Sequence, residues 1–384
     1  MDSLQVEPLA SLPPAEWDAL VAAAGADPAD PNPSLSHAFL AALESSGCAT
    51  PATGWEPRFI TLRRDGRLAG ALPLYAKSHS WGEFVFDWAW ADAYRQHGLA
   101  YYPKWIAASP FTPTPGPRLL AASRADRASL LAAALDQARA AGVSSLHLLF
   151  PQEAQAREMA GQGLMLRQGV QFHWHNPGYG DFAGYLAHLR RDKRKKVQQE
   201  RRRVRDGGFT FHHLTGREAT EGDWRHFMAC YARTHQQYHA PMALNLDFFL
   251  TAAATLPDHL LLVIAEREGR PVAAAFNLLG PKTLYGRAWG SLEYHPGLHF
   301  ETCYYQAMDF CLARGIARFE GGAQGEHKLA RGFLPTVTWS AHWLAHPRFS
   351  RAVEDYLARE GAGMAGYLDE LNERYPFRHT SSAE

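Results

Sequence analysis

The stretch that decides the fold runs from Gly286 to Pro335 and reads GRAWGSLEYHPGLHFETCYYQAMDFCLARGIARFEGGAQGEHKLARGFLP. Its pattern predicts a strand that ends at Trp289-Gly290, a helix from about Phe300 to Arg314, and a short strand from Ile316 to Glu320. A polar loop follows that last strand. Open α/β sheets place their ligands where loops leave the carboxyl ends of strands, so this order predicts an α/β fold with its functional groups in the loop.

The loop itself, GGAQGEHKLARG, contains many polar groups for its length. It holds five side chains that could bind or react, namely Gln324, Glu326, His327, Lys328 and Arg331. A structural turn seldom needs so many charged groups, and a surface loop seldom needs paired glycines beside them. The loop is therefore the first candidate for the functional site, although Glu326 and Lys328 could also form an ordinary surface ion pair.

Length and composition bound the class of protein. The chain has 384 residues, which is enough for two ordinary domains with their own cores. None of the four cysteines belongs to a CxxC pair, which fits a reduced, cytoplasmic setting. The amino terminus lacks the basic start and apolar core of a signal peptide, and no run of about 18 apolar residues exists. We therefore expect a soluble cytoplasmic protein without a membrane span.

One strongly basic segment stands out in an otherwise neutral chain. Residues 190–206, RRDKRKKVQQERRRVRD, carry ten Lys and Arg residues and three acidic residues, a local charge of +7 in a protein of net charge +0. The apolar spacing around them predicts one helix from Asp181 to Arg205. Two interpretations stay open: a solvated charged helix, or a surface that contacts an anionic partner.

The second half of the sequence repeats the pattern of the first half. FITLRRDGRLAGALPLY around Gly66 matches LVIAEREGRPVAAAFNLL around Gly269, and ALDQARAAGVSSLHLLFPQE around Gly142 matches AMDFCLARGIARFEGGAQGE around Gly315. The closing strands QFHWH and SAHWL agree as well. Three matches in the same order favour a duplicated domain over a chance similarity of two α/β units.

A turn-rich segment near Asn176–Gly180 predicts the boundary between the copies. We expect an N-terminal domain of residues 1–176 and a C-terminal domain of residues 177–384 that carries the functional loop. The unequal spacing of the matches predicts an aromatic, proline-rich insertion in the first copy before Pro117. The remaining pattern predicts helices at Trp17–Ala24, Ser36–Ser45 and from Ser123 or Asp126 to Ala141, and strands at Trp55–Arg63, Leu68–Ala76, Trp81–Trp90 and Ser144–Phe150, with a hairpin turn at Asp65-Gly66.

Four longer motifs carry a resemblance to a known family. They are HGLAYYPKW…SPFTPTPGPRLL, FHWHNPGYGDFAGYL…RRDKRKKVQQER, GRAWGSLEYHPGLHFETCYYQ and GAQGEHKLARGFLP. From about Phe59 to His346, the chain is similar to the bacterial FemAB-like N-acyltransferases of the GNAT superfamily. The resemblance implies an α/β fold of two tandem GNAT-like acyltransferase domains with mixed sheets. It also implies an N-acyltransferase that moves an acyl or aminoacyl group onto an amine, for example on a peptidoglycan precursor.

The resemblance leaves the acyl donor open between two classes. Ordinary GNAT enzymes use acyl-CoA, whereas Fem ligases use aminoacyl-tRNA. The segment SLEYHPGLHFET lacks the Q/R-x-x-G-x-G/A spacing with which a GNAT loop holds the pyrophosphate of acetyl-CoA. The helical arm that Fem ligases use on tRNA is not evident either. The basic helix is the remaining candidate, and Arg191, Arg194 and Lys195 are expected to contact the phosphates of acyl-CoA or of a tRNA partner.

Acyl transfer also assigns roles to residues near the loop. The reaction needs a proton acceptor for the amine and a positive charge near the carbonyl oxygen as negative charge develops there. Glu326 or His327 is expected to take the proton, and Lys328 to stabilise the oxyanion or an anionic part of the donor. Further candidates for substrate contacts are Arg287, His299, Glu301, Tyr304, Gln324 and Arg331 around the loop, and Tyr101, Tyr102, Lys104 and Trp105 in the aromatic insertion.

Other interpretations of the same residues stay open. Arg287, Tyr304 and Trp105 could be packing groups, and Glu301 could merely stabilise a helix amino terminus. Three histidine pairs have i, i+4 spacing, but no HExxH motif or cysteine set accompanies them, so we expect no metal. The alternative to an enzyme is a non-catalytic protein that binds an anionic ligand in a duplicated cleft.

Overall fold

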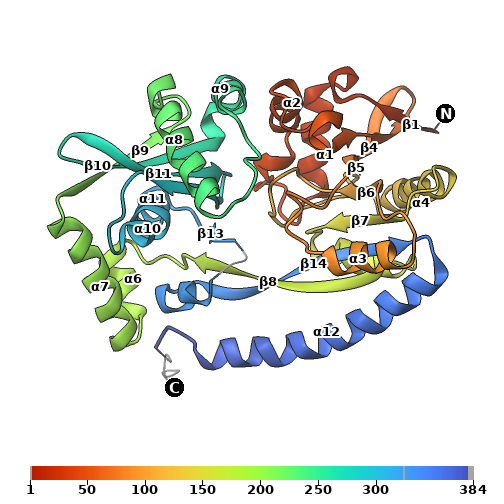
Figure 1. The fold of residues 1–384 in the computed structure, drawn as a ribbon. Helices are drawn as coiled ribbons and strands as arrows, with labels where there is room; N and C mark the ends of the chain where they lie inside the picture. The colour runs from red at the N-terminus through yellow and green to blue at the C-terminus, as the bar shows by residue number, and fades with distance from the viewer. Residues whose placement is uncertain (1, 323–324, 379–384) are drawn as a thin grey trace. The chain divides into compact units, whose positions relative to one another are not determined.

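The computed structural model describes residues 2–322 and 325–378, which form two compact units (Figure 1). The first unit comprises residues 2–169 and 337–366, and the second comprises residues 170–322, 325–336 and 367–378. Each unit combines a sheet with helices and has its own apolar core. The chain therefore has the α/β organisation that its sequence predicts.

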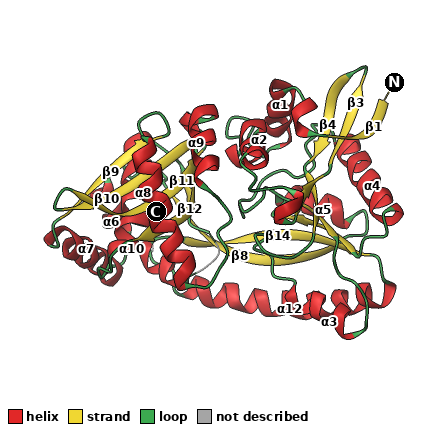
Figure 2. Cartoon of the chain, turned by 45° about the horizontal axis from the view of Figure 1, so that its top comes forward, coloured by secondary structure: helices red, strands yellow, loops and turns green. Residues whose placement is uncertain are grey.

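The first unit contains a small antiparallel sheet of order β1-β3-β4 (Figure 2). It also contains a larger sheet of order β2-β5-β6-β7-β14. Helix α4 packs on β3 and β4 and covers part of the apolar core. The strands are β1 (Asp2–Glu7), β2 (Trp55–Pro57), β3 (Phe59–Arg64), β4 (Arg67–Leu72), β5 (Leu74–Lys77), β6 (Lys104–Ala107), β7 (Ser145–Leu149) and, from residue 337, β14 (Leu334–Leu344). The helices are α1 (Pro14–Ala24), α2 (His37–Ser45), α3 (Trp88–Gln96), α4 (Arg124–Ala140) and α5 (Glu153–Ala160).

The second unit contains one mixed sheet of order β8-β13-β12-β11-β10-β9. Its strands are β8 (Met165–His175, from residue 170), β9 (Phe209–Thr215), β10 (Leu260–Arg267), β11 (Arg270–Leu279), β12 (Thr283–Ser291) and β13 (Arg318–Glu320). Its helices are α6 (Phe182–His188), α7 (Arg191–Asp206), α8 (Glu221–Gln237), α9 (Leu246–Thr255), α10 (Leu298–Phe300) and α11 (Gln306–Arg314). The long helix α12 (Pro347–Glu373) begins in the first unit and ends in the second.

The hairpin of each unit has the same turn and the same irregularity. β3 and β4 join through Asp65-Gly66, and β10 and β11 join through Glu268-Gly269; all four residues have positive φ, at 51°, 82°, 53° and 72°. Such two-residue turns match the right-handed twist of the strands they connect. Each hairpin also has a register shift just before its turn, between Leu62 and Arg63 in one and between Ala265 and Glu266 in the other.

The parallel strands of the two units correspond as well. β6 runs parallel to β7, and β12 runs parallel to β13, with a helix between the strands of each pair. In the first unit β7 pairs antiparallel with β14, and in the second unit β13 pairs antiparallel with β8. Trp343 lies opposite Leu146, and Trp174 lies opposite Phe319. The order and directions of β6-β7-β14 and of β12-β13-β8 are the same, which supports the duplication that the sequence predicts; superposition of the two copies would test it further.

The compact units differ from the division predicted at residues 176/177. The chain leaves the first unit within β8, and residues 337–366 return to it through β14. The reason is strand pairing: the closing strand of each unit comes from the other half of the sequence. A turn-rich segment such as Asn176–Gly180 marks the end of a strand, but it does not reveal which sheet that strand joins.

The insertion of the first copy lies between β5 and β6. These strands pair directly, with Lys77 opposite Lys104, although residues 78–103 separate them in the sequence. In the second unit, β11 and β12 are connected by residues 280–282 alone. The insertion therefore lies before Pro117, as the sequence predicts, and it comprises residues 78–103.

Within this insertion, the predicted strand Trp81–Trp90 is wrong. Residues 81–87 form turns, and α3 begins at Trp88. Aromatic residues favour strands, but here Trp81, Phe84 and Phe86 are 45–61% exposed, whereas Glu83 is buried. A buried ion pair between Glu83 and Lys104 holds the segment in place, so electrostatic contacts override the strand propensity.

The basic helix is also shorter than predicted. Two helices, α6 and α7, replace the single helix Asp181–Arg205, because Leu189 and Arg190 are extended. Leu189 forms a bridge with Phe377, and the Arg190 amide donates to the Pro376 carbonyl at 2.9 Å. By contrast, the predicted helix starts at Ser36 and Ser123 are confirmed, since both hydroxyls accept a backbone amide of the first turn.

Among the described residues, none of the helices combines the length and the apolar character needed to cross a lipid bilayer.

Candidate functional site

The two parallel strands of the second unit part from one another halfway along β12. β12 and β13 pair from Thr283↔Arg318 to Tyr285↔Glu320, where β13 ends, while β12 continues to Ser291. A pocket of about 130 Å³ opens beyond the last pair and is lined by β11, β12, the following helix and the end of β13. This is the carboxyl end of the parallel pair, where α/β sheets place their ligands.

Arg287 lines this pocket because of a bulge in β12. The register with β11 passes from Phe276↔Ala288 to Asn277↔Gly286, so Arg287 is an extra residue on its strand. Bulges of this kind redirect a side chain and are common beside active sites. Burial lowers the pKa of the guanidinium to about 10, against the opposing influence of Tyr231 and Glu320, so Arg287 is charged at neutral pH.

The helical wall of the pocket contains a π-helical turn, Glu301–Tyr305, between α10 and α11. Single π turns inside helices are frequent at functional sites. His299, Cys303 and Tyr304 line the pocket from this wall. Burial lowers the pKa of His299 to about 4, so its imidazole is neutral at pH 7. Burial also raises the pKa of the Cys303 thiol, which therefore stays protonated.

Lys328 lies beside the same wall, in a 3-10 helix that spans Glu326–Arg331. The helix follows Gly325, whose φ of 98° and whose closeness to the His327 ring leave no room for a side chain. Lys328 is 4% exposed; its Nζ donates to the Gly322 carbonyl at 3.4 Å and lies 6.0 Å from the centre of the Tyr304 ring. Burial lowers the pKa of Lys328 to about 8.

Arg331 holds this loop against α7. Its guanidinium bonds Glu200 at 2.6 Å and stacks 3.5 Å from the centre of the Phe300 ring, and the residue is 1% exposed. It also donates to the His327 carbonyl at 2.6 Å. These contacts fix the backbone on both sides of Lys328, which is a positioning role.

The two predicted proton acceptors have different surroundings. Glu326 is exposed, and its carboxylate accepts from Tyr367 at 3.1 Å and from Arg374 at 2.6 Å. His327 Nε2 lies 3.3 Å from the hydroxyl of Tyr304, a pocket residue, and partial burial together with Arg331 and Lys328 lowers its pKa to about 4. The geometry therefore connects His327, rather than Glu326, with the pocket.

Five other predicted residues lie away from this pocket or cannot be located. Glu301 is on another face of the same helix, where it pairs with Arg201 at 3.0 Å. Arg191 and Lys195 line an open surface hollow with Arg190, Asp192 and Arg378, and the nearby Arg194 is half-buried. Gln324 lies outside the described residues.

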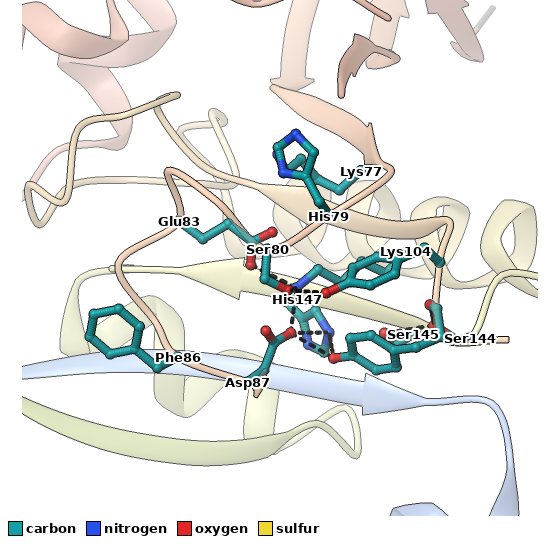
Figure 3. A network of polar contacts seen from close by, with 12 residues as sticks. Lys77, His79, Ser80, Glu83, Phe86, Asp87, Lys104, Ser144, Ser145 and His147 are labelled. Carbon is teal, nitrogen blue, oxygen red and sulfur yellow. Dashed lines mark hydrogen bonds and ion pairs between the residues drawn. The ribbon is translucent and has the colours of Figure 1, made fainter. Parts of the chain in front are cut away.

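The predicted aromatic contacts belong to a buried polar network in the first unit (Figure 3). Lys104 donates to Glu83 at 2.7 Å and to Ser80 at 2.8 Å, and it also pairs with Asp87. The other three residues surround this cluster: the Tyr101 hydroxyl donates to Asp87 at 2.6 Å, Tyr102 bonds Ser80 at 2.7 Å, and Trp105 packs in the core. Lys104 is fully buried, and its charge is paired with Glu83 and Asp87 inside the unit; a ligand contact at these residues stays a prediction.

Comparison with known proteins identifies the family. A family model for FemAB-like proteins, described as peptidoglycan biosynthesis/recognition, matches residues 8–379. The chain belongs to the FemAB-like family. The family resemblance predicted from the sequence motifs is thereby confirmed. No curated protein sequence matches the chain.

Solved structures show the fold of this FemAB-like protein. FemX is similar with 10% identity and a TM-score of 0.57, covering 89% of this chain and 98% of that chain. L-PGS from Bacillus licheniformis has 10% identity and a TM-score of 0.53, with 85% and 98% covered. A tandem GNAT protein from the clavulanic acid biosynthesis pathway has 13% identity and a TM-score of 0.49, with 90% and 99% covered. The predicted α/β fold is confirmed, and FemX and L-PGS share it.

Four residues that contact the pocket or the predicted site residues were not predicted from the sequence. Cys303 lines the pocket, Glu200 anchors the loop, and Glu83 and Asp87 hold Lys104. No pattern in the sequence indicates that Glu83 and Asp87 are buried while aromatic residues beside them are exposed. The His342-Trp343 pair of the closing strand β14 could have indicated a buried polar contact, because His342 bonds His147 at 2.8 Å.

The histidine pairs do not assemble a metal site within the part of the chain that the structure describes. No group of three or more His, Cys, Asp or Glu side chains there is arranged to hold a metal ion.

Proposed function

We propose that this FemAB-like protein is an N-acyltransferase that moves an acyl or aminoacyl group onto an amine, for instance on a peptidoglycan precursor, in the pocket between β12 and β13. One observation carries the proposal: the parallel strands separate where a bulge turns Arg287 into the pocket, and the buried Lys328 lies beside its wall. Membership of a family described by peptidoglycan biosynthesis/recognition supports the class of acceptor.

The steps of acyl transfer determine which groups the site must contain. The lone pair of the amine attacks the carbonyl carbon of a thioester or ester, so a C–N bond forms and negative charge moves onto the carbonyl oxygen. The amine loses a proton to a base. The C–S or C–O bond of the donor then breaks, and the leaving thiolate or alkoxide takes up a proton. The site therefore needs a positive charge, a proton acceptor and a pocket that holds the reactants together.

The described residues can provide the positive charge and the proton acceptor. Arg287 and Lys328 bring positive charge to the pocket, and Lys328 is close enough to influence the pKa values of His299 and Cys303. His327 is neutral at pH 7 and faces the Tyr304 hydroxyl, so it can accept a proton directly or through a water molecule. The burial of Lys328, which is 4% exposed, strengthens its electrostatic interactions relative to water.

The lowered pKa of Lys328 leads to a prediction about pH. If Lys328 acts as a cation, kcat should fall as the pH rises through about 8, because burial lowers its pKa from the ordinary 10.5 to that value. Lys328→Arg keeps the charge and should move the fall above pH 10. A pH profile of kcat for both proteins measures this effect. A wild-type rate that keeps rising between pH 8 and 10 would contradict the cationic role.

The basic helix α7 leads to a prediction about the donor. Replacing Arg191, Arg194 and Lys195 together by alanine should raise KM for the donor about tenfold at low salt while kcat changes little. The difference should shrink as salt screens the wild-type contacts. A steep dependence of KM on salt would indicate aminoacyl-tRNA, whose many phosphates release counterions, and a shallow dependence would indicate acyl-CoA. Donor binding by the triple variant equal to the wild type at low salt would exclude these residues.

The decisive experiment is a direct assay of transfer. The full-length protein would be incubated with acyl-CoA or aminoacyl-tRNA and with amine acceptors that include peptidoglycan precursors, and products would be identified by mass spectrometry. Mass spectrometry of ligands that co-purify with the protein would guide the choice of substrates. Formation of an amide that depends on Lys328 would support the proposal. Stoichiometric ligand binding without any transfer would instead indicate the non-catalytic binding protein.

A further inference from the structure

A second pocket in the second unit lies on another face of the π-helical wall. It has a volume of about 480 Å³, within the range of small-molecule sites. Glu301 and Gln306 line it from the helix that presents Cys303 and Tyr304 to the smaller pocket, and the two pockets share no lining residue. The proposed acyl transfer uses none of its residues, so its ligand has to be inferred separately.

Aromatic side chains form one part of this pocket. Phe209 and Phe211 lie two residues apart on β9, and Phe182 comes from α6. The guanidinium of Arg201 already stacks 4.1 Å from the centre of the Phe182 ring. Phe211 and Phe182 are only partly buried, so their faces remain accessible to a planar ring. This wall favours a flat, aromatic ligand group.

Positive charge forms the rim. Arg201, Arg202 and Arg205 of α7 all line the pocket. Arg201 is neutralised by Glu301 at 3.0 Å and by Asp309 at 2.6 Å. Arg202 and Arg205 are exposed, and Arg205 has one long contact of 3.8 Å to the Asp206 carboxylate. Guanidinium groups bind phosphate oxygens in a bidentate manner. The rim therefore favours a phosphorylated ligand.

A buried carboxylate oxygen supplies the third feature. Glu301 is 3% exposed, and its Oε1 accepts from Gln306 at 2.7 Å and from Arg201 at 3.1 Å. Its Oε2 is buried and has no hydrogen-bond partner within residues 2–322 and 325–378. A buried acceptor without a donor is unfavourable, and each such group calls for an explanation. A ligand that brings an N–H donor into the pocket would complete this site.

We propose that this pocket binds a nucleoside phosphate whose base carries an exocyclic amine. The base lies against the phenylalanine rings, its amine donates to Glu301 Oε2, and its phosphates bond Arg202 and Arg205. An aromatic wall, an unsatisfied acceptor and a guanidinium rim together match these three parts of one molecule. The site is separate from the pocket of the proposed transfer reaction, and its occupation can be tested without any transferase assay.

The test is calorimetric titration of the full-length protein with ADP at low salt. Charge reversal at the rim, Arg202→Glu with Arg205→Glu, should weaken ADP binding at least about tenfold, because two charge-assisted contacts are lost. The matched control is Lys196→Glu with Arg203→Glu, which changes the charge of the same helix equally at exposed positions outside the pocket. The control should bind ADP within about threefold of the wild type. If both variants lose the same ADP affinity, the effect comes from the overall charge of the helix, and the proposed site is wrong.

Recognition of the base by Glu301 is tested by comparing the binding of ADP with that of IDP. IDP has a carbonyl where ADP has its exocyclic amine, so the wild type should prefer ADP at least about tenfold, and Glu301→Gln should largely abolish that preference. Thermal unfolding checks that Glu301→Gln stays folded, and pyrophosphate serves as the anion-only probe. No heat from ADP up to millimolar concentration, or pyrophosphate binding as tightly as ADP, would overturn the assignment of a nucleotide.

Discussion

Lys328→Ala is expected to lower kcat of the proposed transfer reaction about 100- to 1000-fold, the usual effect of removing one group that stabilises a developing oxyanion. KM should change little, because the carbonyl oxygen carries its full negative charge only in the transition state. Burial makes the effect large: Lys328 is 4% exposed, so water cannot readily replace its charge. Steady-state kinetics of the variant with the identified donor and acceptor measure both constants.

Two further variants make the Lys328 result interpretable. Lys328→Arg retains the charge and should recover part of kcat, which a purely structural role for the side chain would not explain. Lys282→Ala removes an exposed lysine just before β12 and should keep the wild-type rate. Full activity of Lys328→Ala, or a raised KM with unchanged kcat, would show that this lysine does not act on the transition state.

Lys104→Met is expected to destabilise the first unit by about 3–5 kcal/mol, the usual cost of removing one partner of a buried ion pair. Lys104 is fully buried and bonds Glu83 at 2.7 Å and also Asp87, so its loss leaves two buried carboxylates without their cation. Methionine fills nearly the same volume, which keeps the effect electrostatic. Denaturant unfolding that follows the first unit measures the change in the free energy of unfolding.

The loss should depend on pH in a defined direction. Burial raises the pKa of Glu83 from its ordinary 4.5 to about 7, so the folded protein holds this proton more tightly than the unfolded chain between those values. Ionising Glu83 therefore costs stability as the pH rises through this window. Without Lys104, which opposes that shift, the pKa rises further. Lys104→Met should consequently be more destabilising at pH 8 than at pH 5.

A combined variant serves as the control for this cluster. Adding Glu83→Gln and Asp87→Asn to Lys104→Met removes the buried charges and should recover most of the lost stability at pH 8. An equal loss at pH 5 and pH 8, or no recovery in the combined variant, would show that packing rather than charge explains the effect.

The candidate site was predictable only where its residues are close together in the sequence. The loop after β13 could be identified from its composition, and it contains Lys328 and His327, both of which lie beside the pocket wall. Arg287 could be named as a candidate, but nothing in GRAWG reveals the bulge that turns its side chain into the pocket. The bulge is a property of two paired strands, so one strand's sequence does not specify it.

The first unit illustrates the same limit for buried charge. HGLAYYPKW suggested that Tyr101, Tyr102 and Lys104 contact a ligand, yet they bond Asp87, Ser80 and Glu83 inside the unit. The acids Glu83 and Asp87 lie in the aromatic segment WGEFVFDW, residues 81–88, and a sequence pattern would place the acids at the surface and the rings in the core. The opposite arrangement arises because a lysine on the neighbouring strand compensates both carboxylates.

The sequence by itself determined the family and the α/β class and predicted the duplication, because these depend on local patterns that recur in both halves. The turns at Asp65-Gly66 and Glu268-Gly269 and the helix starts at Ser36 and Ser123 rest on contacts between near neighbours. Only the tertiary structure decided that β14 closes the first unit and β8 the second. Alternation of apolar residues specifies that a strand exists, but its partner depends on contacts between residues far apart in the chain, which no local pattern records.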